Sequence, residues 1–257
     1  MNYTAVNTKV LAKRSQMLNH QNYQALVCFT SIEALTAALT AIQGEWTSQS
    51  LFDEYKPIAS FIHVKPVKDY IRTLAYGLAG AHASVSPGIA ASGTEIKHWS
   101  YVSWRKLNML DKPSREPLRR ILGTEMDLRN IIWIYRLKQY HRIEGGATFG
   151  YLLPSGYRLP GEIVTGLVDC KDATAMIDIL SQSPYCDTFK SIEDLRMGEQ
   201  ILTKIIRAKF RRENHSTNAA CICGYLYEKH LEHKNIRAIK EGINLGFAPG
   251  DILKRLY

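Results

Sequence analysis

Apolar side chains along this chain recur mainly at the spacing of an α-helix. Alternating patterns typical of strands are scarce. The segment 151–160, YLLPSGYRLP, looks extended, but its two prolines argue against a central strand. We therefore predict an all-α protein. The predicted helices cover residues 5–18, 31–44, 67–78, 100–110, 115–122, 191–212 and 219–242, and loops are expected at 84–94, 143–157 and 211–217. Ser31 is the expected N-cap of the second of these helices, and the same Ser-Ile-Glu signal marks the helix start at Ser191.

The most apolar helix is predicted at residues 127–142, DLRNIIWIYRLKQYHR. Its apolar residues fall into two stripes, one of Leu128, Ile131, Ile132 and Tyr135, and one of Trp133, Leu137 and Tyr140. A helix with two apolar stripes needs two packing partners, so we expect it to be buried between other helices. Arg136 lies one turn from both stripes and needs a carboxylate partner if its guanidinium is covered.

The start of this helix carries a capping pattern. Gly123 is expected to end the preceding helix, because glycine readily adopts the left-handed conformation that follows a helix. Thr124 would then be the N-cap residue, and Thr124 with Asp127 would form a capping box.

Four features recur in the same order in two parts of the chain. An acid precedes an Asn-Ile pair by three residues, in Asp127 with Asn130 and in Glu232 with Asn235. A Gly-aromatic pair follows at 156–157 and 246–247, and then a Pro-Gly-acid-Ile helix start at 160–163 and 249–252. The ordered match predicts an internal repeat. The structural motif residues are Thr124, Asp127, Asn130, Arg136, Pro160, Glu162, Asn235, Arg237, Pro249 and Asp251.

The composition of the chain indicates the charge of its partner and the cellular compartment. The 257 residues carry a net charge of +9, which favours an acidic partner: nucleic acid, an anionic membrane surface or an acidic protein. Arg115, Arg119 and Arg120 are the candidate contacts for such a partner. The five cysteines are odd in number and irregularly spaced, so a reducing cytoplasm is expected. The uncharged run 73–94 is interrupted by Gly, Ser and Pro, and we predict no transmembrane span there.

No catalytic, cofactor-binding or metal site is expected from the motifs. The glycine-rich GGATFG at 145–150 lacks the Lys-Ser/Thr of a phosphate loop. His230 and His233 are expected on a solvated helix face, and Cys221 and Cys223 in the core. The alternative is a basic helical nucleic-acid-binding protein, for which RAKFRREN at 207–214 would be the contact. An enzyme of unknown type is the less favoured alternative.

Four segments together resemble the C/d subunit family of V-type and A-type ATPases. They are GTEMDLRNIIWIYRLKQYH, YLLPSGYRLPGEI, SIEDLRMGEQIL and YEKHLEHKNIRAIKEGINLGFAPGDILKRL. The resemblance is strongest at 118–167 and 219–256 and weakest at 45–100.

The resemblance implies three similar helical lobes arranged as a funnel with pseudo-threefold symmetry. We expect a first lobe at 1–112, a second at 113–188 and a third, shorter than in the family, at 189–257. It further implies a non-catalytic socket in the central stalk of a rotary ATPase that transports H⁺ or Na⁺. The expected partners are the rotor-shaft subunits of D and F type and the membrane proteolipid c-ring. One copy per complex, no cofactor, no bound nucleic acid and a cytoplasmic, membrane-peripheral location are expected.

Overall fold

The computed structural model describes residues 3–43, 55–56, 58–83, 102–143, 145–153 and 156–257. Within these ranges the regular secondary structure is helical and no strand is found, so the predicted all-α class is confirmed. The helices are α1 (Thr4–Arg14), α2 (His20–Leu26), α3 (Ile32–Gln43), α5 (Lys65–Ala83), α7 (Lys112–His141), α8 (Gly146–Phe149), α9 (Gly161–Asp169), α10 (Ala173–Ser181), α11 (Ile192–Arg196), α12 (Gly198–Arg212), α13 (Ala219–Asn244) and α14 (Pro249–Leu253), with a 3₁₀ helix η1 at Leu107–Met109. Residues 102–106 are also helical. The loop expected at 84–94 lies outside the described residues.

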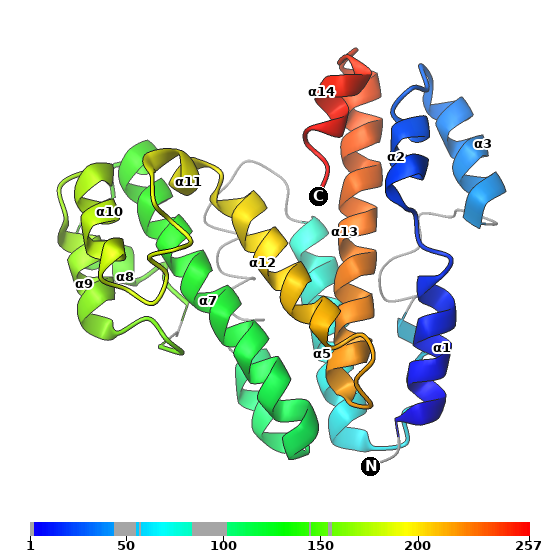
Figure 1. Ribbon diagram of the computed structural model, residues 1–257, viewed down its shortest axis with the longest axis horizontal. Coiled ribbons are helices and arrows are strands. Elements are labelled where there is room, and N and C mark those ends of the chain that lie inside the picture. The colour runs from blue at the N-terminus through cyan, green and yellow to red at the C-terminus, as the bar shows by residue number, and fades with distance from the viewer. Residues whose placement is uncertain (1–2, 44–54, 57, 84–101, 144, 154–155) are drawn as a thin grey trace. The chain divides into compact units, whose positions relative to one another are not determined.

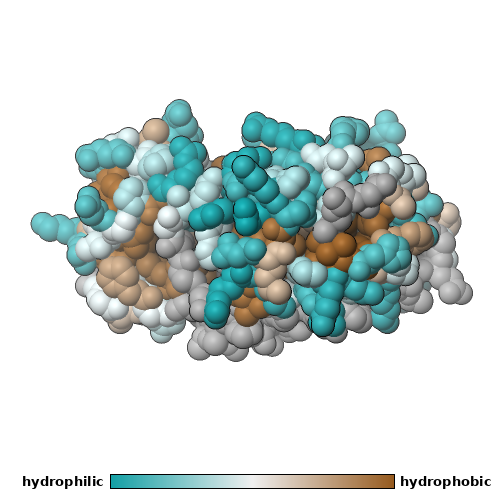
Figure 2. Space-filling model, turned by 90° about the horizontal axis from the view of Figure 1, so that it is seen from below, coloured by the Kyte–Doolittle hydropathy of each residue, from teal (hydrophilic) through white to brown (hydrophobic). Residues whose placement is uncertain are grey.

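The chain divides into two compact units. The first combines residues 1–83 with 213–257, and the second comprises residues 84–212. The division into three lobes at 1–112, 113–188 and 189–257 stays a prediction. None of the helices in the described ranges is long and apolar enough to cross a membrane. On the face drawn in Figure 2, hydrophobic residues are visible in several places between hydrophilic ones.

The first unit is built around α13. This helix packs against α1, α3, α5 and α14 (Figure 1). One apolar core joins α2, α3, α13 and α14 and contains Leu18, Leu26, Val27, Leu35, Leu39, Ile236, Ile239 and Ile252. Ser31 caps α3 as predicted, because its Oγ accepts a hydrogen bond from the Ala34 amide at 3.2 Å.

The second unit is built around α7, which runs between α12 on one side and α9 and α10 on the other (Figure 1). The predicted stripe from Leu128 to Tyr135 is buried, with Ile131 and Ile132 fully inaccessible. The second stripe is only partly buried, because Tyr140, in the last turn of α7, is 62% exposed. Leu137 of that stripe is buried. The helix therefore has two packing partners over most of its apolar length, as predicted.

The predicted break at Gly123 is wrong. Helix α7 continues through Gly123 and Thr124 and ends at His141, and its C-cap residue Arg142 adopts the left-handed conformation with φ 51°. Thr124 is not an N-cap, because its hydroxyl donates to the carbonyl of Arg120 one turn earlier, at 2.7 Å. No capping box of Thr124 with Asp127 forms.

The helix predicted at 191–212 is instead two helices. Ser191 and Asp194 form a capping box at the start of α11, as the Ser-Ile-Glu signal suggested. Helix α12 begins at Gly198, where a Cβ would overlap the side chain of Ile132 on α7. The close approach of α7 and α12 therefore depends on a glycine at this position.

Candidate functional site

Asp127 of α7 holds the loop that precedes α9. Its side chain is fully buried, and its Oδ2 accepts hydrogen bonds from the amides of Arg158 and Leu159 at 2.8 and 3.1 Å. The hydroxyl of Tyr185 donates to the same oxygen at 2.8 Å. Burial, followed by the charge of Asp127, raises the pKa of Tyr185, so this phenol stays a donor. Asp127 thus joins three distant segments of the second unit.

Asn130, one turn further along α7, holds the same loop at an earlier point. Its Nδ2 donates to the carbonyl of Leu153 at 3.0 Å, and its Oδ1 accepts from the amide of Leu153 at 2.8 Å. An asparagine that pairs with both backbone groups of one residue imitates a strand partner and fixes that residue in place.

The other acid, Glu232 of α13, binds the backbone of a different part of the chain. Its Oε2 accepts from the amide of Leu18 at 2.9 Å, just before the N-cap residue Asn19 of α2. Its Oε1 accepts from the Lys229 ammonium at 2.7 Å, and this ion pair is buried. Glu232 therefore attaches the N-terminal segment of the chain to its last long helix.

Asn235 repeats the contact of Asn130. Its Nδ2 donates to the carbonyl of Tyr257 at 3.2 Å, and its Oδ1 accepts from the amide of Tyr257 at 2.8 Å. In both long helices, an asparagine three residues after an acid thus pairs with both backbone groups of one residue that lies 22 or 23 positions later.

The two acids bind segments at different places in the chain. Asp127 contacts a segment that comes later than its own helix, whereas Glu232 contacts a segment near the N-terminus. Asp127 binds the residues just before α9, and Glu232 binds the residue before the N-cap of α2. The helix start at Pro249 is attached by another route: Ile252 of α14 packs where a Cβ on Gly242 would lie. The sequence match between 160–163 and 249–252 therefore has different surroundings in the two units.

The two helix starts that share the Pro-Gly-acid-Ile sequence each have an acidic residue in the first turn. Glu162 lies in the first turn of α9 and Asp251 in the first turn of α14, where a carboxylate meets the positive end of the helix. Pro249 is in the first turn of α14, whereas Pro160 is the N-cap residue of α9. Arg237 pairs with Glu241 on the surface of α13 at 2.9 Å.

Arg136 finds its carboxylate within the same unit. Its Nη1 lies 3.2 Å from Oε1 of Glu199 on α12. The Arg136 side chain is 41% exposed, so this pair lies at the surface and contributes at most about 1 kcal/mol. Its role is to join α7 and α12 beside the Gly198–Ile132 contact.

Gly123 has a packing role that the capping interpretation missed. A Cβ at this position would overlap the ring of Tyr157. Together with Asp127 and Asn130, Gly123 fixes Leu153 and residues 157–159 along one side of α7.

We expect Gly123→Ala to lower the free energy of unfolding of the second unit by about 1–3 kcal/mol, because the new methyl group must displace the Tyr157 ring. Gly166→Ala is the matched control: it also adds a methyl group inside a helix, but its nearest neighbour is Ile179 Cδ1 at an ordinary 3.6 Å. Gly166→Ala should raise the free energy of unfolding of the second unit by about 0.5–1 kcal/mol, because alanine loses less conformational freedom in a helix than glycine does. Urea unfolding followed by circular dichroism measures both, and equal effects of the two changes would contradict the packing role of Gly123.

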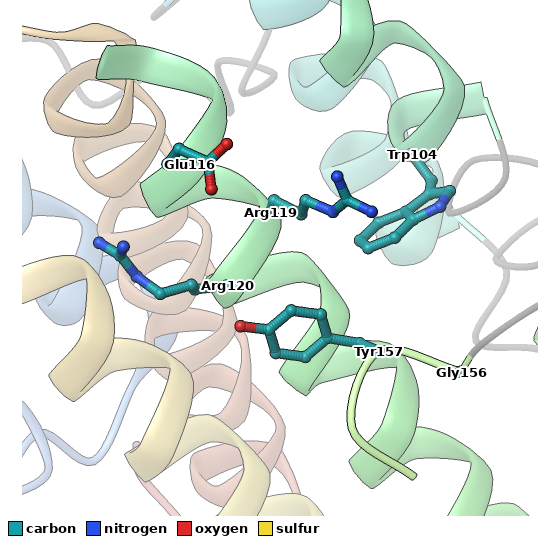
Figure 3. A pocket seen from close by; sticks show the side chains of 6 residues that line it. All are labelled: Trp104, Glu116, Arg119, Arg120, Gly156 and Tyr157. Carbon is teal, nitrogen blue, oxygen red and sulfur yellow. The ribbon is translucent and has the colours of Figure 1, made fainter. Parts of the chain in front are cut away.

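The three arginines predicted as partner contacts lie in the first turns of α7. The Nε of Arg115 lies 3.9 Å from Oε1 of Glu116. Arg119 and Arg120 are exposed and, with Glu116, line a pocket of about 310 Å³. Trp104, Gly156 and Tyr157 also line the pocket, and the guanidinium of Arg119 lies 5.6 Å from the centre of the Trp104 ring (Figure 3).

Further basic residues lie near Arg120. Partial burial, followed by the charges of Arg212, Arg158 and Arg120, lowers the pKa of Lys209 on α12. The basic residues thus come from α7, from the loop that Asp127 holds and from the end of α12.

The remaining sequence predictions have mixed outcomes. Cys221 and Cys223 are buried as predicted, and burial raises the pKa of both thiols. The solvated face predicted for His230 is wrong, because α13 is covered on several sides and His230 is only 8% exposed. Phe210, at the centre of the basic segment 207–214, is buried and 2% exposed. Among the described residues, no group of three or more His, Cys, Asp or Glu side chains could hold a metal ion.

The geometry defines a class first: an all-helical protein whose two units are each organised around one long buried helix. The family model of the ATP synthase (C/AC39) subunit matches residues 97–255, well over half of the chain. The chain therefore belongs to the C/AC39 subunit family, the central-stalk subunits of V-type and A-type ATPases. A comparison with curated proteins gives no match.

Proposed function

We propose that this chain is a non-catalytic rotor subunit that couples the rotor shaft of a V-type or A-type ATPase to the membrane proteolipid ring. The carrying observation is the family match over residues 97–255. In this proposal the shaft is formed by subunits of D and F type, and one copy of the chain is present per complex. The transported ion, H⁺ or Na⁺, is bound by the ring subunits.

The helical architecture supports a role in transmitting torque. Helix α7 has 30 residues and α13 has 26, so they extend over about 45 and 39 Å at 1.5 Å per residue. Both are buried along most of their length, and close-packed interiors deform little under load. Backbone contacts of Asp127, Asn130, Glu232 and Asn235 attach the loops around them to these two helices.

Surface composition supports docking to other subunits. The net charge of +9 suits acidic partner loops or anionic lipid headgroups beside the ring. Several large apolar side chains are also exposed, including Met109 at 60%, Tyr140 at 62% and Leu245 at 67%. Aromatic residues and methionine are enriched where proteins meet. A cytoplasmic, membrane-peripheral location follows from the proposed docking on the ring.

The repeated acid and asparagine support an internal duplication of lobes. We propose that α7 with α9 and α10, and α13 with α2 and α3, are equivalent parts of two lobes. In each, the acid binds the backbone just before the first helix of the pair, and Asn130 and Asn235 make the same backbone contacts. This pairing takes residues from both ends of the chain into one lobe.

Co-purification tests the proposed function. The tagged chain, expressed in its native cell and extracted in mild detergent, should retain the rotor-shaft and proteolipid subunits, identified by mass spectrometry. Reversing the charge of Arg115, Arg119 and Arg120 together should weaken ring binding and reduce its salt dependence. Retention of neither shaft nor ring subunits by the unmodified chain would refute the proposal.

The nucleic-acid alternative gains no support from the geometry. An aromatic side chain that stacks on bases must be accessible. The only aromatic residue of segment 207–214 is Phe210, which is buried.

A further inference from the structure

The loop between α13 and α14 exposes an uncharged and largely apolar stretch of chain. Residues 242–250, GINLGFAPG, carry no ionisable side chain, and residues 244–251 are all exposed. Leu245 is 67% exposed, the largest value for a large hydrophobic residue in the described ranges, and Phe247 is 37% exposed. The loop lies at one end of the first unit, where α13 ends (Figure 1). Neighbouring apolar side chains at such a position indicate a surface that contacts a partner.

Backbone hydrogen bonds hold this loop in one conformation. The Phe247 amide donates to the carbonyl of Gly242 at 2.9 Å, and the Gly246 amide donates to the carbonyl three residues earlier at 3.1 Å. With Gly246 at φ 67°, this is the pattern of a Schellman motif. The residue in the place of Phe247 commonly packs on the helix position that accepts its bond or on the position before it. Here these positions are Gly242, which Ile252 covers, and the charged Glu241, so Phe247 stays exposed.

Positive charge flanks the loop on both adjoining helices. Lys240 lies one turn before the end of α13, and the guanidinium of Arg255, just after α14, lies 4.5 Å from the centre of the Phe247 ring. The two acids that border the apolar stretch are each paired with a basic residue, Glu241 with Arg237 at 2.9 Å and Asp251 with Lys254 at 3.0 Å. Residues 237–255 thus hold four basic and two acidic side chains, and the surroundings of the loop are positive.

We propose that this loop docks on an anionic lipid bilayer, with Leu245 and Phe247 at the boundary between headgroups and acyl chains. The order of the side chains matches that of the bilayer surface, because an uncharged apolar tip is followed by basic residues that suit anionic headgroups. Aromatic residues are enriched at this boundary. A lipid surface is favoured over a protein partner because the exposed stretch has eight residues, whereas a stable protein interface uses about 20–30 on each side.

This inference rests on the proposed function for its setting, since it names the surface by which a subunit beside the ring would contact the surrounding lipid. One small loop binds a bilayer weakly, and attachment to the ring would raise its effective concentration at the membrane. Binding to vesicles can nevertheless be measured without ring subunits. Its failure would leave the co-purification result unchanged, and a failed co-purification would leave vesicle binding unchanged.

Vesicle flotation of the purified chain tests the proposal. Phosphatidylcholine vesicles with added phosphatidylserine should bind the chain at least about tenfold more tightly than phosphatidylcholine alone, and added salt should weaken this binding. Leu245→Ser combined with Phe247→Ser should reduce binding by about tenfold or more, because the apolar tip is lost. Lys240→Gln combined with Arg255→Gln should reduce it by about tenfold, because two charges near the anionic surface are lost.

Matched controls change the same kinds of residue elsewhere in the chain. Met109→Ser combined with Tyr140→Ser removes two apolar side chains of the second unit that are 60% and 62% exposed. Arg72→Gln combined with Lys190→Gln removes two exposed positive charges. Both controls should bind anionic vesicles within about twofold of the unmodified chain, because charges distant from the bilayer are screened by salt. Circular dichroism verifies that every variant is folded.

Fluorescence quenching measures whether the loop enters the bilayer. Phe247→Trp should add emission that lipids brominated on their acyl chains quench, whereas Tyr140→Trp should add emission that they do not quench. The proposal is overturned if anionic vesicles bind the chain no better than neutral ones, if either folded loop variant binds like the unmodified chain, or if the controls lose as much binding. It is also overturned if Phe247→Trp adds no quenched emission. Loop variants that bind vesicles normally but lose shaft or ring subunits on co-purification would likewise overturn it, because the loop would then contact a protein.

Discussion

Asp127→Ala is expected to destabilise the second unit by about 3–4 kcal/mol, among the largest effects of any single substitution in it. The fully buried carboxylate accepts from the amides of Arg158 and Leu159 and from the hydroxyl of Tyr185, all at Oδ2. Removing it leaves these donors without their shared acceptor in a site from which water is largely excluded. Urea unfolding gives the loss of stability. Hydrogen exchange should show faster exchange at the amides of Arg158 and Leu159.

Two further variants should lower the stability of the second unit by smaller amounts. Asp127→Asn keeps a neutral acceptor, but its NH₂ group would take the position of Oδ1, which has no hydrogen-bond partner among the described residues. Asp127→Asn should therefore lower the free energy of unfolding by about 2 kcal/mol, between the effects of the other two variants. Tyr185→Phe removes one donor only and should cost about 1 kcal/mol. Asp187→Asn is the surface control, because that side chain is 91% exposed and pairs with the exposed Lys190, so its effect should stay within about 0.5 kcal/mol. An Asp127→Ala effect as small as that of Asp187→Asn would contradict the assigned role.

Much of the helical framework could be predicted from the sequence because it depends on local patterns. The two apolar stripes of residues 127–142 indicated a helix with more than one packing partner, and α7 is packed between α12 on one side and α9 and α10 on the other. The caps at Ser31 and Ser191 were predicted by short-range side-chain chemistry and are present. Arg136 is partly exposed, so the condition under which it would have needed a carboxylate is not met, although Glu199 lies beside it.

The failures occurred where a distant residue decides the local conformation. Gly123 and Thr124 have the sequence of a helix end and a cap, but Tyr157 packs on Gly123 and the helix continues. Glycine serves equally for a left-handed turn and for a close approach, and the local sequence does not distinguish the two uses. His230 was expected on a solvated face because histidine is polar, whereas α13 is surrounded by helices from both ends of the chain.

The motif residues of the candidate site could be predicted, but their partners could not. The spacing of acid and asparagine singled out Asp127, Asn130 and Asn235. Their partners lie 22 to 58 residues away, as in Tyr185 for Asp127, and no periodic signal marks such a pairing. The pocket residues Trp104 and Tyr157 were missed for the same reason. The positive charge of Arg119 and Arg120 was visible in the sequence, and the structure adds the cavity that they line.

Glu232→Gln should destabilise the first unit by about 3–5 kcal/mol, because it leaves a buried ammonium without its counter-ion. The side chains of Lys229 and Glu232 are 9% and 1% exposed, and their charged atoms lie 2.7 Å apart. Glutamine keeps the size of the side chain and can still accept from the Leu18 amide through its carbonyl oxygen. The loss therefore measures the uncompensated charge of Lys229, and urea unfolding of the folded chain is the appropriate measurement.

Adding Lys229→Met to Glu232→Gln separates this electrostatic cost from the role of Glu232 in holding the N-terminal segment. The methionine removes the unpaired charge and fills a similar volume, so the double variant should recover most of the stability lost in Glu232→Gln. The Leu18 amide should remain protected from hydrogen exchange in both, since its acceptor is retained. Glu232→Ala with Lys229→Met removes the acceptor as well and should expose that amide. If Glu232→Gln proved as stable as the unmodified chain, or if the methionine failed to restore it, the buried pair would not be what makes this position sensitive. If the Leu18 amide exchanged equally fast with glutamine and with alanine at position 232, the attachment of the N-terminal segment to α13 would depend on apolar packing in the core around Leu18 and Ile236 instead.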